Sequence, residues 1–354
     1  MADTPRKKRR SYEPAFVAQL LSAIFSRRSL RWVALFATLG LMIASSLFRS
    51  DVTVSLSSPP SASALSSAAS LCAKPTPRVV SHRGVDEDAH GGPAPSTARS
   101  IKSLLDEGFG SFDVDLFWAA EDIGGRNLFI GHPPSLRKLW ALPDEVHALP
   151  IKILHAKAKA AAPTIDKATP MLTLAELCHI LANRRADELG TVSLELKFPQ
   201  HAEWRRNVDV LYTTLAAAGA GRSQRALFVI VVTDAAQATE HRLAQARHGL
   251  AMPLYLVVGD LGARIGADGE PHANLTMLAA EPAARIDGWS CSVKLFDAEL
   301  RAAATRAHKP LAAWTIDTEA ALRRAYASGA DDVVTNKPRW ARRVIAQWRA
   351  ECGG

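Results

Sequence analysis

Short apolar runs alternate with longer amphipathic segments along the chain from residue 78 onward. The apolar runs are rich in Val, Ile, Leu and Phe, as buried β-strands are, and comprise Val79–Ser81, Phe112–Phe117, Leu128–Ile130, Val192–Leu196, Leu227–Val232, Leu254–Val258, Leu311–Thr315 and Val333–Val334. Amphipathic segments with helical spacing separate most of them, such as Ile101–Glu107 and the Ala-containing Leu174–Arg184, Val208–Ala218 and Thr318–Ser328. This alternation predicts parallel β-strands covered by α-helices.

A doubly wound open sheet and a closed (β/α)8 barrel both satisfy this alternation. No glycine-rich phosphate loop follows the first apolar run. Roughly eight strand signals over roughly 270 residues match the usual length of the closed barrel. We therefore predict an α/β fold of the (β/α)8 TIM-barrel type over residues 75–350. The helical apolar spacing of Trp340–Trp348 predicts the last helix that covers this barrel.

A longer apolar run lies near the N-terminus. Clusters of Lys and Arg precede Trp32–Phe48, an uncharged segment of Leu, Ile, Val, Phe, Met and Ala. The run is about long enough for a hydrocarbon core of roughly 30 Å. We therefore predict a basic cytoplasmic tail at 1–29 and a transmembrane signal anchor at 30–48. A cleaved secretory signal is the alternative, because small residues near the end of the run suit a peptidase.

The basic flank orients either kind of segment, because Lys and Arg beside an apolar span stay on the cytoplasmic side. We therefore expect a single-pass membrane protein whose barrel is lumenal or extracellular, or a secreted protein if the segment is cleaved. Residues 49–74 include the stretch SLSSPPSASALSSAAS, which predicts a disordered linker. Most of the net charge of +8 is explained by the basic N-terminal cluster. We therefore expect membrane contact there and no nucleic-acid binding.

The four cysteines are far apart and form no CxxC pair, which argues against a zinc site. Some of them can pair in an oxidising compartment. Cys178 and Cys291 lie in apolar segments, and we expect both to be buried thiols.

Polar residues stand at the ends of the predicted strands, where a TIM barrel carries its chemistry. They are two histidines, three carboxylates, an arginine and a lysine: His82, Arg83, Asp113, Asp115, His132, Glu195 and Lys197. Alternate residues of a strand share a face, so Asp113 and Asp115 point inward together. Glu195 and Lys197 do the same. Trp289, in the segment DGWSCS, is a further candidate for substrate contact.

These residue types suit a phosphate pocket. Three carboxylates favour a hard divalent cation such as Mg²⁺ or Ca²⁺, and no soft ligand set for zinc accompanies them. Arg83 and Lys197 add positive charge for an anion, for which phosphate is the simplest choice. Two histidines beside that phosphate can divide the roles of acid and base.

This set of motifs resembles the glycerophosphodiester phosphodiesterase family, within the superfamily of phospholipase-C-like phosphodiesterase barrels. His82-Arg83-Gly84 matches the motif that opens the family, and an acidic-x-Asp pair, a Gly-His segment and a Glu-x-Lys strand follow it. The segment Trp314–Pro338 matches the family's last two strands with the helix between them. The similarity spans residues 78–340.

The resemblance implies a role for each of the strand-end residues. It implies that Asp113, Asp115 and Glu195 are the metal ligands. It implies that His82 and His132 are the acid–base pair, and that Arg83 and Lys197 contact the phosphate. It also implies that a neighbouring hydroxyl of the substrate attacks phosphorus and gives a cyclic phosphate, which water then opens. His82 is expected to be the base and His132 the acid in the first step.

Several positions depart from the family pattern. Asp113 stands where the family usually has the longer Glu, and Pro93–Thr97 replaces the usual Pro-Glu-Asn-Thr. Two prolines, in place of an Asp, follow His132. Together with LFIGHPPSLRKLWALP, these departures are closer to a divergent branch that includes the fungal altered-inheritance-of-mitochondria proteins. A weaker likeness is to the sphingomyelin-cleaving phospholipase D group. The expected substrate is therefore a glycerophosphodiester or a related lipid-derived phosphodiester.

Two alternatives to this hydrolase stay open. The first is a catalytically inactive barrel that binds an anionic head group or a protein partner, which the short Asp113 and the absent Pro-Glu-Asn-Thr motif would explain. The second is a phospholipase-D-like lyase that stops at the cyclic phosphate and uses the same residues.

Overall fold

The computed structural model describes residues 71–85, 87, 96–118, 128–132, 156, 172–197, 202–219, 227–259, 263–265, 271–275, 278 and 285–352. The predicted tail and anchor lie outside these residues, as does the predicted linker up to residue 70. None of the helices in the described part has the length and apolar content that a membrane crossing requires.

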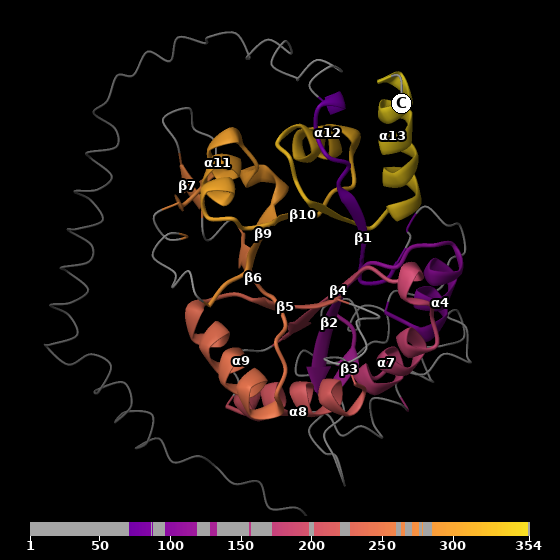
Figure 1. Cartoon of the computed structure of the whole chain (residues 1–354), viewed down its shortest axis with the longest axis vertical. Helices are drawn as coiled ribbons and strands as arrows, with labels where there is room; N and C mark the ends of the chain where they lie inside the picture. The colour runs from indigo at the N-terminus through magenta and orange to yellow at the C-terminus, as the bar shows by residue number, and fades with distance from the viewer. Residues whose placement is uncertain are drawn as a thin grey trace, which may run out of the picture. The chain divides into compact units, whose positions relative to one another are not determined.

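Eight parallel strands form a closed ring, with the helices outside it (Figure 1). In sequence order the strands are β1 (Arg78–His82), β2 (Phe112–Trp118), β4 (Thr191–Leu196), β5 (Leu227–Val232), β6 (Leu254–Val258), β9 (Gly288–Ser292), β10 (Leu311–Trp314) and β11 (Asp332–Thr335). Strand β1 pairs with β11 on one side and with β2 on the other, which closes the ring. The predicted (β/α)8 barrel is thereby confirmed.

The ring differs from the sequence prediction at two short segments: one predicted strand lies outside the ring, and one segment without a strand prediction lies in it. The apolar run Leu128–Ile130 is strand β3, which pairs antiparallel with β2 outside the ring. The segment Gly288–Ser292, sequence GWSCS, is the barrel strand β9 between β6 and β10. It begins with a glycine and has none of the β-branched residues that favour strands, so tertiary pairing rather than local preference places it in the sheet.

Helices cover the outer face of the ring. They are α4 (Ala98–Asp106), α7 (Leu174–Ala182), α8 (Trp204–Ala217), α9 (Ala235–His248), α11 (Ala298–Arg306), α12 (Glu319–Ala327) and α13 (Pro338–Glu351). The short 3-10 helices are η3 (Ala186–Glu188) and η5 (Val293–Leu295), and β7 (Ala263–Ile265) with β8 (Pro271–Ala273) forms an antiparallel pair between β6 and β9. Helix α13 is the predicted last covering helix.

Local sequence explains where several helices begin. Thr97 caps α4, because its hydroxyl accepts from the Ser100 amide while the Ser100 hydroxyl accepts from the Thr97 amide. Thr173 and Glu176 form the same reciprocal pair at α7. Pro338 begins α13, where its missing amide hydrogen is not needed.

The hydrophobic core lies between the ring and the helices. Strand β6 shows this arrangement: Leu254, Leu256 and Val258 point outward and are at most 2% exposed. Their apolar side chains pack with residues of the covering helices in one cluster. The inward face of the ring is therefore the face that is left for the site.

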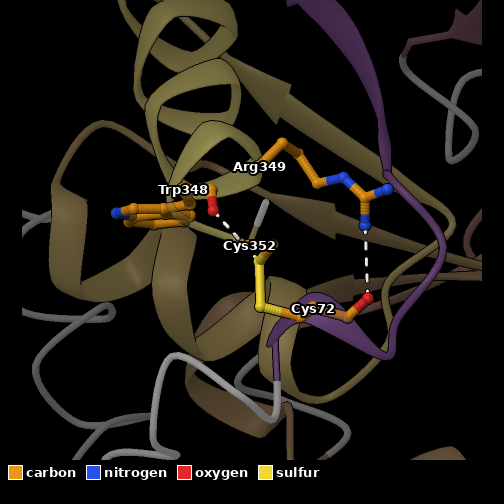
Figure 2. Close-up of a disulfide and its surroundings, with 4 residues drawn as sticks. All are labelled: Cys72, Trp348, Arg349 and Cys352. Atoms are coloured by element: carbon orange, nitrogen blue, oxygen red, sulfur yellow. Dashed lines mark hydrogen bonds between the residues drawn. A yellow bond between two sulfur atoms is a disulfide. The ribbon is translucent and has the colours of Figure 1, made fainter. Parts of the chain in front are cut away.

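A disulfide links the two ends of the described chain. Cys72, which precedes β1, bonds to Cys352 at the end of α13 (Figure 2). The Arg349 guanidinium of α13 donates a hydrogen bond of 3.3 Å to the Cys72 carbonyl oxygen, beside the bridge. Cys178 and Cys291 are buried thiols, as predicted.

Candidate active site

A cavity of about 270 Å³ lies inside the ring and reaches the carboxyl ends of the strands. Six residues that were predicted from strand ends line it: His82, Arg83, Asp113, Asp115, Glu195 and Lys197. They come from β1, β2 and β4 or from the residues that directly follow β1 and β4. The closed ring therefore gathers side chains that stand more than a hundred positions apart in the sequence.

His82, the last residue of β1, is oriented by two polar side chains near the end of β11. Its Nδ1 lies 2.7 Å from Asn336 Oδ1, and Asn336 Nδ2 donates to Asp317 Oδ2 at 2.8 Å. Asp317 Oδ1 also accepts from the Asn336 backbone amide at 2.9 Å, so Asp317 holds both the backbone and the side chain of Asn336. Because the Asn336 oxygen faces His82, Nδ1 carries the proton and donates, and Nε2 keeps its lone pair.

Burial lowers the pKa of His82 below its ordinary value of 6.5, and the positive charge of Arg83 lowers it further. The hydrogen bond to Asn336 acts in the opposite direction and is the weaker influence. His82 is therefore neutral near pH 7 and can accept a proton at Nε2.

The tight turn after His82 points Arg83 back toward the cavity. Arg83 has a φ of +58°, and its amide donates to the Asp113 carbonyl oxygen at 2.6 Å. Gly84 has the same φ, and a Cβ there would lie 2.9 Å from Ile101 Cγ1, so only glycine fits. Arg83 Nε lies 3.4 Å from Asp115 Oδ2.

Lys197 Nζ lies between two of the three carboxylates. It is 2.8 Å from Asp115 Oδ1 and 2.5 Å from Glu195 Oε1. Burial lowers the pKa of Lys197, but the charges of Asp115 and Glu195 outweigh burial and raise it. Burial raises the pKa of Glu195, and the charge of Lys197 opposes this.

The charged form of Asp113 is unfavourable in this arrangement. Burial raises its pKa to about 8, and the negative charges of Asp115 and Glu195 act in the same direction. Three hard oxygen donors with this excess of negative charge fit a divalent cation such as Mg²⁺ or Ca²⁺.

The spacing of these carboxylates is wider than that of an assembled metal centre. Among the described residues, the group of three potential ligands whose atoms all lie within 4.8 Å of one another is His272, Asp297 and Glu299, near the start of α11. This group is a possible metal site outside the cavity lining. Asp297 already caps α11 through the Leu300 amide and lies 2.8 Å from His272 Nδ1.

His132 follows β3 and lies near the charged cluster without lining the cavity. The Gly131 amide donates to the Asp115 carbonyl oxygen at 2.9 Å, which holds this segment against β2. Burial lowers the pKa of His132 to about 4. The negative charge of Asp115 opposes this, while Arg83 and other nearby positive groups reinforce it. Both imidazoles are therefore brought toward the same group of charges.

Trp289 does not reach this site. It is the second residue of β9, is 5% exposed and packs in the hydrophobic core between the ring and the helices. Side chains alternate along a strand, so Trp289 faces outward because its neighbour Ser290 faces the cavity. The tryptophan that lines the cavity is Trp314, the last residue of β10.

Several polar residues of the site have no role assigned to them from the sequence. Asn336 and Asp317 hold His82, and Ser193, Tyr255 and Ser290 line the cavity. Asn336 and Asp317 do belong to the closing segment that resembles the family, and that resemblance was the signal available. The serines and Tyr255 stand within strands, where residue type alone gives no signal.

These observations define a (β/α)8 barrel whose carboxyl-terminal mouth combines an oriented neutral histidine, three carboxylates and two cations around one cavity. Such a site suits a phosphate ester with a divalent cation. No protein-family model matches the chain, and no curated protein is similar to it in sequence.

Solved structures share this fold. A candidate glycerophosphoryl diester phosphodiesterase of Silicibacter pomeroyi DSS-3 has a TM-score of 0.59 and 18% identity, covering 77% of this chain and 94% of that one. A candidate glycerophosphodiester phosphodiesterase of Galdieria sulphuraria has a TM-score of 0.58 and 15% identity, with coverage of 77% and 99%. An Oleispira antarctica phosphodiesterase, in complex with the product sn-glycerol-3-phosphate, has a TM-score of 0.56 and 15% identity, with coverage of 77% and 97%. The resemblance that the motifs indicate is thus matched by the fold.

Proposed function

We propose that this protein is a metal-dependent phosphodiesterase that cleaves glycerophosphodiesters or related lipid-derived phosphodiesters. The observation that supports this most directly is the gathering of His82, Arg83, the carboxylates and Lys197 on one cavity of the barrel. The fold is shared with glycerophosphodiester phosphodiesterase structures, one of which holds sn-glycerol-3-phosphate.

The proposed reaction begins with His82 as the base. A hydroxyl of the substrate gives its proton to His82 Nε2, and its oxygen forms a bond to phosphorus. The bond from phosphorus to the leaving alcohol breaks, and that alcohol takes a proton from His132. The product is a cyclic phosphate, which water opens with the two proton transfers reversed in direction. Each transfer contributes about 10² to 10⁴-fold to the rate.

His132 needs a higher pKa for its proposed role as an acid. Burial and nearby positive charges keep this imidazole neutral at pH 7 in the protein alone. A bound phosphodiester brings a negative charge close to it and so favours the protonated form. His132 is therefore proposed to become an effective acid once substrate is bound.

Asp113, Asp115 and Glu195 are the residues proposed to hold the divalent cation. When bound, the cation would neutralise charge on the phosphate oxygens and lower the repulsion among the three carboxylates. Arg83 and Lys197, which lie beside these carboxylates, are proposed to contact the phosphate.

A second candidate function is an anion-binding barrel without turnover. It is favoured by one observation: Lys197 already pairs with Asp115 and Glu195, two of the three proposed metal ligands. Calorimetry of the folded protein with Mg²⁺ and with Ca²⁺ distinguishes the two. Binding that is lost in Asp115→Asn supports the metal-dependent enzyme, and no binding of either ion favours the inactive barrel.

We also propose that the barrel lies in a lumen or outside the cell. The disulfide between Cys72 and Cys352 supports this, because such bonds persist in oxidising compartments. The predicted anchor or cleaved signal at 30–48 would deliver the barrel there.

The decisive experiment is an activity screen of the full chain, which retains Cys72, against a panel of phosphodiesters with and without EDTA. We expect cleavage that is lost with EDTA and falls by about 10²-fold or more in His82→Ala and in His132→Ala. His179→Ala, which removes an exposed imidazole of α7, is the matched control and should keep full activity. Unchanged turnover in both site variants would refute the proposal. Phosphorus NMR of the products separates a hydrolase from a lyase that accumulates the cyclic ester.

A further inference from the structure

The Lys197 ammonium lies where it contacts two of the three proposed metal ligands. Its Nζ is 2.8 Å from Asp115 Oδ1 and 2.5 Å from Glu195 Oε1. The other carboxylate oxygen of Asp115, Oδ2, lies 3.4 Å from Arg83 Nε. Both oxygens of Asp115 therefore already face positively charged groups of the protein.

These contacts occupy Lys197 as well as the carboxylates. The Lys197 side chain is 21% exposed and that of Asp115 is 9% exposed, so neither charge is well solvated. Charges that are taken out of water are stable only when opposite charges and hydrogen bonds compensate them. An ammonium has three hydrogens to donate, and the two carboxylates account for two of them. Lys197 in this position therefore has little left to offer a phosphate.

A divalent cation and the Lys197 ammonium compete for the same carboxylates. Mg²⁺ and Ca²⁺ bind carboxylate oxygens at about 2.0–2.6 Å. A cation held by Asp115 and Glu195 would therefore face the ammonium as a like charge at short range. Such repulsion is strong in a poorly solvated site. Metal binding thus requires Lys197 to leave its contacts with the carboxylates.

The cavity offers Lys197 another anion once a phosphate is bound. Lys197 directly follows β4, and its flexible side chain lines the same cavity as His82 and Arg83. A displaced ammonium keeps its charge compensated when it contacts the phosphate oxygens instead of the carboxylates. A phosphate and a divalent cation can therefore replace the two kinds of contact that hold Lys197 in the protein alone.

We propose that Lys197 is an internal counter-ion of the metal ligands, which a divalent cation displaces onto the phosphate of the substrate. The inference rests on the proposed function and adds how metal and phosphate binding are coupled at this site. The cation frees Lys197 for the phosphate, and the phosphate compensates the freed charge. By thermodynamic linkage, each ligand raises the affinity for the other by the same factor. The site therefore binds metal tightly only when a phosphate ester is present.

A Lys197 that stays in place makes a different prediction. If it contacts phosphate from its position beside the carboxylates, its removal weakens phosphate binding equally with and without metal. If the cation displaces it, its removal weakens phosphate binding mainly when metal is present. This difference separates displacement from a general electrostatic attraction between Lys197 and the phosphate.

Titration calorimetry of the full chain with sn-glycerol-3-phosphate, with and without Mg²⁺ or Ca²⁺, makes this comparison without turnover. Lys197→Met should lower the affinity for this ester at least about tenfold with metal and less than about threefold without it. It should raise the affinity for the metal alone about tenfold, because the competing charge is gone. Lys197→Gln, which keeps a hydrogen-bond donor beside the carboxylates, should behave in the same way.

Lys102→Met is the matched control, because Lys102 is an exposed lysine of α4. It should keep all of the wild-type affinities. Equal losses of ester affinity with and without metal, in both Lys197 variants, overturn the inference. If the wild type nevertheless cleaves a phosphodiester, the proposed function is retained. Coupled binding that depends on Lys197, without cleavage of any diester, would overturn the phosphodiesterase and retain the displacement.

Discussion

At the scale of single residues, the orientation of His82 depends on side chains that do not line the cavity. Asn336 accepts from His82 Nδ1 and is itself held by Asp317 through its side-chain and backbone nitrogens. Asp317 Oδ1 accepts a third hydrogen bond, from Thr335 Oγ1. The Asp317 carboxylate, acting through Asn336, thus sets the tautomer of His82, the proposed base.

Asp317→Asn is expected to lower kcat about tenfold or more, with a smaller change in KM. An asparagine at this position cannot accept from all three donors, so the Asn336 amide is free to turn its nitrogen toward His82. The measurement is steady-state cleavage of a glycerophosphodiester. Glu319→Gln, an exposed substitution two positions along the chain, should behave as wild type. A wild-type kcat in Asp317→Asn would show that His82 is oriented by other groups.

At the scale of elements, helices α8 and α9 pack through a buried polar cluster. Tyr212 of α8 lies 3.0 Å from His241 Nδ1 of α9, and its hydroxyl accepts from Gln245 Nε2 at 3.1 Å. Burial lowers the pKa of His241 to about 3. The imidazole is therefore neutral in the folded protein and accepts from the tyrosine hydroxyl.

The stability of the fold should decrease as the pH falls below about 6.5, in part because of His241. The unfolded state takes up a proton at this residue below its ordinary pKa of about 6.5, whereas the folded state does so only near 3. Between these values the free energy of unfolding falls by up to about 1.4 kcal/mol per pH unit. Urea unfolding at several pH values should therefore give a shallower dependence for His241→Gln than for wild type.

His179→Gln is the control for this measurement, because it removes an exposed imidazole of α7. It should keep the wild-type dependence of stability on pH. Parallel curves for wild type and His241→Gln would contradict the assignment of a neutral, buried His241.

At the scale of the whole molecule, two features join the beginning of the described chain to its end: strand pairing in the ring and a disulfide. Strand β1 pairs with both β2 and β11, and the disulfide of Figure 2 joins the segment before β1 to the end of α13. The two cysteines are 280 residues apart in the sequence. A bond across so long a loop restricts the unfolded chain strongly in the chain-entropy account of disulfides.

Cys352→Ser should lower the free energy of unfolding by about 2–4 kcal/mol and the melting temperature by several degrees. Thermal unfolding with and without a reductant is the measurement. The wild-type protein in reductant should melt like the variant, and reductant should not change the variant further. Identical melting of the oxidised wild type and Cys352→Ser would mean that the bond contributes nothing to stability.

Prediction from the sequence succeeded for strands with a regular apolar pattern and for the polar residues at the ends of such strands. The apolar runs of β2, β4, β5 and β6 are regular enough to be recognised from the sequence. The predicted polar residues of β1, β2 and β4, or directly after β1 and β4, line the cavity. It failed at β9, whose sequence GWSCS lacks the branched residues of a buried strand. Trp289 was misplaced for the same reason, since its direction depends on a strand that the pattern does not reveal.

The alternation of strands and helices, the polar residues at strand ends and the two buried thiols could be predicted from the amino-acid sequence alone. Each of these depends on residue type and on spacing along a single element. Four features became known from the folded protein: β9 belongs to the ring, Lys197 lies between two carboxylates, Cys72 pairs with Cys352, and a cavity lies inside the barrel. These features depend on which segments, far apart in the sequence, come into contact when the ring closes. The local pattern of residues contains no information about those contacts.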